Sequence, residues 1–268
     1  MQLTSLTDDG TVVTLELDHG RANEMGSAQL EQIAGICETL EGGTVRSLVT
    51  VSRRVSRKGT PIFIAGADVT ERVDWTDDQV KTHVRWQRDV LARLRRAPVF
   101  HVAVVHGVAL GWGTEFLLTT DYAVATPTAR FGLPETGLGI VPGAGGTSEL
   151  WARIGVAQAL RLGMTGEQLG ADEALRIGLV QELANDVDAG LARARELAGA
   201  VARRSPTAVA GFKRGVLDSV GEPSSKRAAI EDTAYTRCVD AGDAAVGRAN
   251  FKAIVEGQSV PWGPLTTD

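Results

Sequence analysis

The run from Val99 to Val105, VFHVAVV, limits the possible fold more than any other part of the sequence. It is nearly all apolar and follows a proline, which would end a preceding helix. An apolar run without polar alternation is typical of a strand that is buried on both faces. Such strands belong to sheets that helices cover on both sides, so the run predicts an α/β protein.

Predicted strands and helices alternate on either side of this run. Alternating β-branched residues or short apolar runs predict strands at 11–18, 47–52, 61–65, 99–105 and 122–125. Helical spacing predicts helices from Ser27 to about position 41, from Thr76 to Arg96, and briefly from Thr114. Thr76 and Gln79 form a capping box, and the buried stripe behind them is expected to be Val80, Val84, Val90, Leu91 and Leu94. Layered parallel strands and a strand–strand–helix spiral both fit this order.

The last third of the chain is predicted to be helical. Helices are expected at 148–159, 170–179, 186–203 and 206–219, and over most of 222–256. Residues 1–200 are therefore assigned to an α/β catalytic body, and residues 201–268 to a helical region. No linker rich in proline or serine separates the two.

Composition excludes several classes of protein. The net charge of −5 argues against a nucleic-acid or anionic-membrane partner. Cys37 and Cys238 lie far apart, which excludes a disulfide scaffold or a cysteine zinc site, and Cys37 is expected in the core. No secretory signal and no apolar run of membrane-spanning length occur. We expect a soluble, cytoplasmic protein without a metal site.

Three glycine-containing turns remain as candidate sites: FIAGADVT, HGVALGWGTE and GLGIVPGAGGT. The last lacks the Gly-Lys-Ser/Thr of a phosphate loop, and Phe116 replaces the third glycine of a dinucleotide fingerprint. No G-x-S-x-G or H-E-x-x-H motif is present. The four histidines do not cluster, and His101, inside the apolar strand, is expected to be a core residue.

Two glutamates flank these turns. Glu115 lies in the first turn of a helix that follows Gly-x-Gly, where free backbone N–H groups could hold an enolate oxygen. The Gly66-Ala67 turn is the natural source of a second donor. Glu115 and Glu135 could then serve as general acid and base. Taken singly, Glu115 is better explained as a helix cap and Glu135 as a surface carboxylate.

These segments resemble the crotonase, or enoyl-CoA hydratase/isomerase, superfamily. The likeness runs from TVVTLELD to about Phe251 and is most specific in FIAGADVTE, HGVALGWGTEFLLTTDYAVA and ARFGLPETGLGIVPGAGGTSEL. It implies a ββα spiral with a C-terminal helical trimerisation region, and trimers that commonly pair into hexamers. Coenzyme A would be part of the substrate, with no further cofactor.

The resemblance also assigns roles to residues. The N–H groups of Ala67 and Trp112 would form the oxyanion hole, and Glu115 and Glu135 lie 20 positions apart, as in the hydratases. Glu115 would activate water and Glu135 would protonate the α-carbon of a 2-enoyl-CoA, or both would act in the reverse dehydration. This implies a lyase, in fatty acid metabolism. Isomerase, C–C hydrolase and hydratase-aldolase chemistry remain alternatives, as does a binding protein without catalysis.

Contacts to the substrate follow from the same likeness. Lys58 or Arg57 would meet a CoA phosphate, unless their loop is simply solvated, and Phe251 would contact CoA, from its own or a neighbouring subunit. The residues expected to line the substrate path are Arg21, Ala22, Ala65, Gly66, Asp68, Val69 and Gly111. Trp112 departs from the family's usual glycine. Its indole must either occupy space near the acyl group or turn into the core, and our hypothesis is that it narrows or reshapes the acyl pocket.

Overall fold

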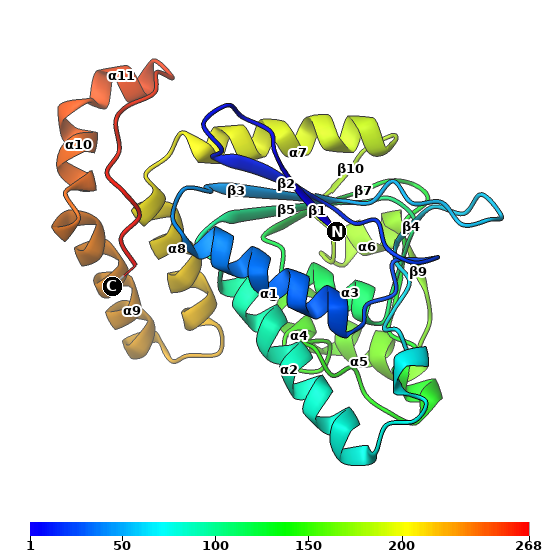
Figure 1. The fold of residues 1–268 in the computed structure, drawn as a ribbon. Coiled ribbons are helices and arrows are strands. Elements are labelled where there is room, and N and C mark those ends of the chain that lie inside the picture. The colour runs from blue at the N-terminus through cyan, green and yellow to red at the C-terminus, as the bar shows by residue number, and fades with distance from the viewer. Residues whose placement is uncertain (268) are drawn as a thin grey trace.

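Two sheets form the body of the protein in the computed structural model, which describes residues 1–267 (Figure 1). The larger sheet has parallel strands apart from its first, which is antiparallel. Its order is β1 (Gln2–Ser5), β2 (Val12–Glu16), β3 (Ser47–Val51), β5 (Phe100–Val105), β7 (Tyr122–Ala125) and β10 (Glu182–Leu183). The smaller sheet has the order β4 (Ile62–Ile64), β6 (Val108–Leu110), β8 (Arg130–Gly132) and β9 (Leu169–Gly170), with only β9 antiparallel.

The chain winds through these sheets as a spiral. Strands β3 and β4 are followed by helix α2 (Asp77–Arg96), and β5 and β6 are followed by helix α3 (Trp112–Leu117). Each turn thus places one strand in each sheet, and strands of successive turns become parallel neighbours. This confirms the α/β prediction and decides the arrangement that the order of elements had left open.

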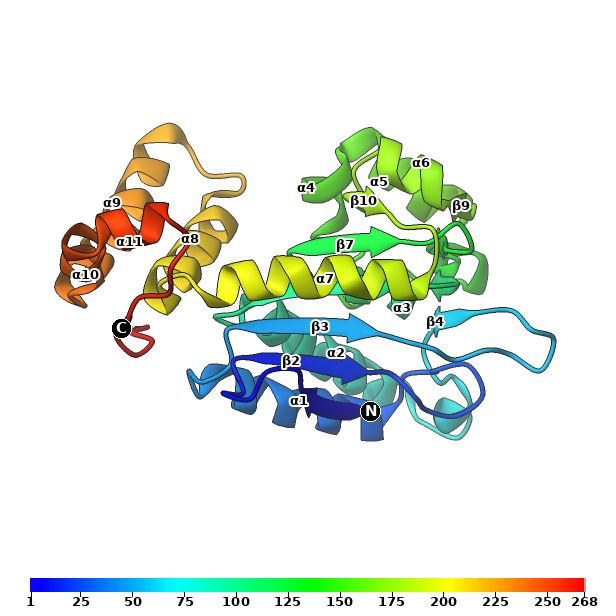
Figure 2. The ribbon, with the colours of Figure 1, turned by 90° about the horizontal axis from the view of Figure 1, so that it is seen from above.

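Helices cover both faces of the large sheet (Figures 1 and 2). Helix α1 (Ser27–Glu41) and helix α2 pack on one face, and helix α7 (Val187–Ala202) packs on the other. The side chains of Val102 and Val104 in β5 meet Leu191 of α7 in one buried cluster. This burial on two sides accounts for the apolar sequence of β5. Cys37 is fully buried, as predicted.

Two helix predictions need correction. The expected helix 148–159 is two helices, α4 (Leu150–Ile154) and α5 (Val156–Thr165), because Gly155 interrupts the helix with a φ of 79°. The capping box of α2 is present, but Val80 and Val84 are only partly buried, and His83 and Gln87 lie on the buried face instead. Helix α6 (Ala171–Arg176) falls within the predicted 170–179 segment.

The C-terminal helices form a separate layer at one end of the molecule (Figure 2). They are α8 (Pro206–Ser219), α9 (Ser224–Asp240), α10 (Asp243–Ala249) and α11 (Phe251–Val255). Lys213 of α8 ties this layer to the body, because its Nζ donates to the Val99 carbonyl and to Asp121 Oδ2, both at 2.9 Å. Within residues 1–267 no helix is long and apolar enough to cross a bilayer.

Candidate active site

The first two glycine-containing turns meet where β4 and β6 end. The two strands are parallel neighbours, with Ile62 beside Val108 and Ile64 beside Ala109. The residues that follow them, 65–67 and 110–112, therefore leave the small sheet side by side. A Cβ atom on Gly113 would lie only 2.2 Å from the Ile64 carbonyl oxygen, so glycine is required for α3 to begin so close to β4.

Two backbone N–H groups at this junction make no bond to protein. The neighbours of Ala67 are occupied, because the Gly66 carbonyl accepts the Met25 N–H and the Asp68 N–H donates to the Met25 carbonyl. In a parallel bridge of this kind the intervening N–H points to the opposite side. Trp112 is the first residue of α3, where an N–H has no partner within the helix. Across residues 1–267, neither N–H donates to a protein acceptor.

Glu115 is held beneath the third turn. Its side chain is only 2% exposed, and Oε1 accepts the N–H of Ala144 at 2.7 Å and that of Gly146 at 2.9 Å. Both bonds fall on one oxygen, so Oε2 stays free for another partner. Burial raises the pKa of Glu115 to about 7, while the two N–H bonds oppose that rise.

Glu135 lies beside the first turn of α3. It begins a short 3-10 helix, η2 (Glu135–Leu138), and a Cβ atom on Gly111 would lie 2.7 Å from its Oε1. Its Oε2 is buried and accepts no hydrogen bond. Burial raises the pKa of Glu135 as well, and its negative charge contributes to the raised pKa of Glu115. The structure therefore brings the two predicted glutamates together.

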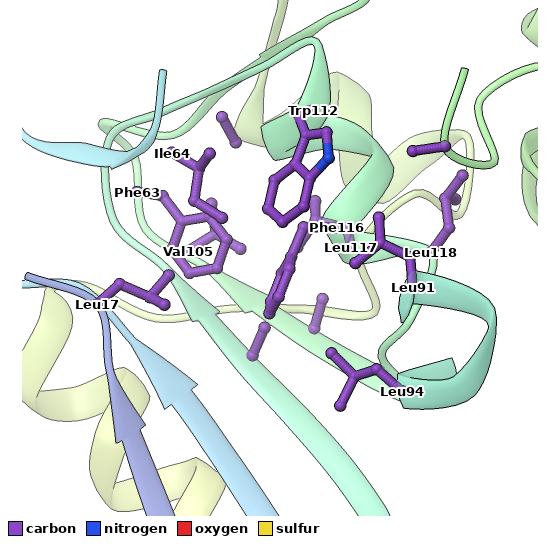
Figure 3. Close-up of a cluster of buried hydrophobic side chains, with 14 of the residues drawn as sticks. Leu17, Phe63, Ile64, Leu91, Leu94, Val105, Trp112, Phe116, Leu117 and Leu118 are labelled. Atoms are coloured by element: carbon purple, nitrogen blue, oxygen red, sulfur yellow. The ribbon is translucent and has the colours of Figure 1, made fainter. Parts of the chain in front are cut away.

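Trp112 turns into the core (Figure 3). Its side chain is 2% exposed, and its ring centroid lies 6.0 Å from that of Phe116. The indole belongs to the same buried cluster as Leu91 and Leu118. This core position contradicts the hypothesis that the indole narrows or reshapes the acyl pocket.

The other predicted residues divide into two groups. Ala22 lies at the junction, because its carbonyl accepts the Ala65 N–H at 3.1 Å, and Val69, 62% exposed, follows Ala67 closely. The Asp68 carboxylate accepts the N–H and the hydroxyl of Thr70, which lowers the pKa of Asp68, so its side chain holds the first residue of the helix η1 (Thr70–Arg72).

The remaining three residues lie farther out. Arg21 is exposed, and Lys58 stands on an exposed loop that projects from the body (Figure 1). Phe251 begins α11, in the C-terminal layer at the opposite end of the molecule from β4 (Figures 1 and 2). The contact of Phe251 with CoA, from its own or a neighbouring subunit, remains a prediction.

Two buried polar side chains beside the site have structural roles that sequence reasoning did not assign, although Asn23 lies in the loop expected to line the CoA path. The Thr114 hydroxyl donates toward the Ala109 and Gly132 carbonyls and accepts the Gly132 N–H, which joins α3 to β6 and β8. Asn23 is fully buried and has a φ of 53°, a value rare outside glycine. Neither role leaves a clear signal in the sequence, because Asn23 lies in the polar loop HGRANEM and Thr114 lies in a glycine-containing turn.

Comparison with known proteins agrees with this geometry. Residues 47–263 match the family described as Enoyl-CoA hydratase/isomerase. The Bacillus subtilis (strain 168) protein YngF, which carries a provisional enoyl-CoA hydratase/isomerase name, is 34% identical over 232 residues, 86% of this chain and 87% of its own. A crystal structure of enoyl-CoA hydratase from Bacillus anthracis has 30% identity and a TM-score of 0.87, with 97% and 98% of the chains covered. Pseudomonas aeruginosa DspI has 27% identity and a TM-score of 0.84, with 97% and 96% covered.

The ββα spiral with C-terminal helices, together with these likenesses, defines a crotonase-superfamily enzyme. Within that class the chain belongs to the enoyl-CoA hydratase/isomerase family.

Proposed function

We propose that this enzyme adds water to the double bond of a 2-enoyl-CoA, or catalyses the reverse dehydration of a 3-hydroxyacyl-CoA. The observation that carries the proposal is the pairing of two carboxyl groups, Glu115 and Glu135, beside the free N–H groups of Ala67 and Trp112. Hydration needs a base for the water, an acid for the α-carbon and donors for the thioester oxygen. The site has candidates for each role.

The surroundings of the two carboxyl groups favour different roles. Two backbone N–H groups bond Glu115 Oε1, and such bonds stabilise the ionised form, which suits a base. Glu135 Oε2 is buried without a donor, which favours the protonated form and suits an acid. Because each negative charge disfavours the other, a state with one carboxylate and one carboxylic acid is favoured over one with two carboxylates.

The reaction then follows in balanced steps. Glu115 takes a proton from a water molecule while the oxygen of that water bonds to the β-carbon. The electrons of the carbon–carbon double bond shift toward the thioester, whose carbonyl oxygen becomes the enolate oxygen. The N–H groups of Ala67 and Trp112 stabilise that enolate oxygen. Glu135 gives its proton to the α-carbon, the carbonyl re-forms, and transfer of the proton held by Glu115 to Glu135 restores the starting state.

An assay of two isomeric substrates tests this reaction against isomerisation. Purified enzyme is supplied with crotonyl-CoA or a 3-enoyl-CoA in water labelled with ¹⁸O, and products are identified by mass spectrometry. The proposal predicts ¹⁸O-labelled 3-hydroxybutyryl-CoA from crotonyl-CoA. Conversion of the 3-enoyl-CoA to its 2-enoyl isomer, with no labelled hydroxyacyl product from either substrate, would establish the isomerase alternative instead.

We further propose that the C-terminal layer mediates self-association into trimers or hexamers. Helices α8 and α9 expose large apolar side chains in the single chain: Phe212, Val216, Tyr235 and Val239. Helix α9 contains no buried residue, although it is one of the longest helices. Light scattering coupled to gel filtration tests this proposal, which predicts a mass of three or six chains and fails if the protein is monomeric.

A further inference from the structure

We propose that Asn23 is the positioning residue for the Ala67 half of the oxyanion hole. The proposal rests on the oxyanion hole assigned above, and it gives a function to a side chain that the catalytic scheme does not use. Asn23 touches no reacting atom. It fixes the backbone from which the Ala67 N–H projects.

The Asn23 side chain joins the ends of three strands. Its Nδ2 donates to the Phe63 carbonyl of β4 at 2.8 Å and to Ser52 Oγ, just after β3, at 2.9 Å. It also approaches the Leu17 carbonyl, just after β2, at 3.3 Å. Oδ1 accepts the His19 N–H at 2.8 Å. Every polar atom of the amide is therefore used, at a site that solvent does not reach.

Ser52 carries the same connection one step further. Its hydroxyl donates to the Ile62 carbonyl at 2.6 Å, so Asn23 and Ser52 together hold two successive carbonyl groups of β4. These contacts anchor β4 just before residues 65–67 leave the sheet. The Ile62 N–H also donates to the Arg54 carbonyl at 2.9 Å, so the side-chain bonds act beside a backbone bond from the same side.

The backbone around Asn23 lies directly against the oxyanion segment. Ala22 accepts the Ala65 N–H, and Met25 pairs with both neighbours of Ala67. The segment 22–25 thus acts as a short strand beside 65–68, and the φ of 53° at Asn23 lets the chain turn between its two contacts. Since the amide fixes segment 22–25 and β4 to each other, its loss should let the direction of the Ala67 N–H vary.

Asn23→Gly tests this role because glycine adopts a positive φ without strain and removes the side-chain amide. The probe is 4-dimethylaminocinnamoyl-CoA, whose absorption moves to longer wavelength when hydrogen bonds polarise its carbonyl. This spectral shift does not require addition of water to the double bond. If the wild-type complex shows no red shift, the oxyanion hole itself is wrong. If only the variant shows a reduced shift, the change is due to the loss of the Asn23 side chain.

We expect Asn23→Gly enzyme saturated with the probe to show a clearly smaller red shift than wild type. Its kcat on crotonyl-CoA should be about 10- to 100-fold lower, which is part of the loss seen when an oxyanion donor is removed outright. Thr50→Val is the matched control: it removes another fully buried hydrogen bond, to His101, away from β4, and should leave the shift unchanged. If Asn23→Gly does not fold, Asn23→Asp keeps the shape and the His19 contact but cannot donate to Phe63. A wild-type red shift in a folded Asn23 variant would overturn the proposal.

Discussion

Gly111 and Glu135 lie so close that a side chain on Gly111 would force the Glu135 carboxylate to move. A Cβ atom on Gly111 would stand 2.7 Å from Glu135 Oε1, and the φ of Gly111 is 53°. The same residue immediately precedes Trp112, the proposed oxyanion donor. One glycine therefore sets both the entry into α3 and the place of the second carboxyl group.

Substitution of Gly111 by alanine should disable catalysis. The added methyl group would displace Glu135, and alanine at positive φ would strain the turn that orients the Trp112 N–H. We expect kcat on crotonyl-CoA to fall at least about 100-fold, the scale of a lost acid–base group. Gly35→Ala is the control, because a Cβ there meets nothing within 4 Å and the site lies within α1. Equal rates in wild type and Gly111→Ala would refute this account of the turn.

Glu115 should make the fold less stable at alkaline pH. Its pKa is about 7 in the folded protein and near the ordinary 4.5 when unfolded, so the folded state binds this proton more tightly. Acidification from pH 7 toward 4.5 therefore adds stability, and this contribution is lost as pH rises through 7. The pKa difference corresponds to about 3 kcal/mol.

Glu115→Gln removes this titration. Urea unfolding at pH 8 should show the variant more stable than wild type by up to about 3 kcal/mol, with the gap narrowing toward pH 5. A gap that does not change with pH would contradict the raised pKa.

Trp112→Ala should reduce stability without changing the choice of acyl group. The indole is sealed in the core against Phe116, and loss of a buried tryptophan costs about 3–5 kcal/mol. Trp151→Ala is the matched control, because that side chain is 41% exposed. Thermal unfolding measures the first effect. The ratio of rates on crotonyl-CoA and octenoyl-CoA measures the second, and a changed ratio would place the indole at the acyl pocket after all.

Lys213→Met should loosen the C-terminal layer. The lysine side chain is 9% exposed, and its removal leaves the Val99 carbonyl and Asp121 without their cation. We expect the free energy of unfolding to fall by about 2–3 kcal/mol. This is less than the loss on breaking a fully buried ion pair, because Asp121 is partly solvated. Lys226 forms an exposed pair with Glu222, so Lys226→Met should lower the free energy of unfolding by less than about 0.5 kcal/mol. Similar losses in both variants would contradict the anchoring role of Lys213.

Local signals in the sequence predicted the elements with strong patterns. The capping box at Thr76 marked the start of α2, and the apolar run at Val99 marked β5. Strands β6 and β8 were missed because each has three residues and is held by its neighbours in the small sheet rather than by its own pattern. The break at Gly155 was missed because apolar residues continue with helical spacing on both sides of it.

The site divides in the same way. Glu115, Glu135 and the glycine turns were predicted, since a short motif contains both the turn and the side chain. Asn23 was not recognised as a connecting residue, because its partners lie at the ends of strands up to 40 positions away and come together only in the folded spiral. The direction of the Trp112 indole likewise depends on the packing of α3 against α2.

The rate of crotonyl-CoA hydration by wild type, Glu115→Gln and Glu135→Gln tests the central claim most directly. Loss of enoyl absorbance follows the reaction, and far-UV circular dichroism verifies that all three proteins are folded. The account predicts measurable hydration by wild type and a fall in kcat of at least about 100-fold in each variant. A wild-type rate in either variant would show that the two carboxyl groups do not act as the acid–base pair.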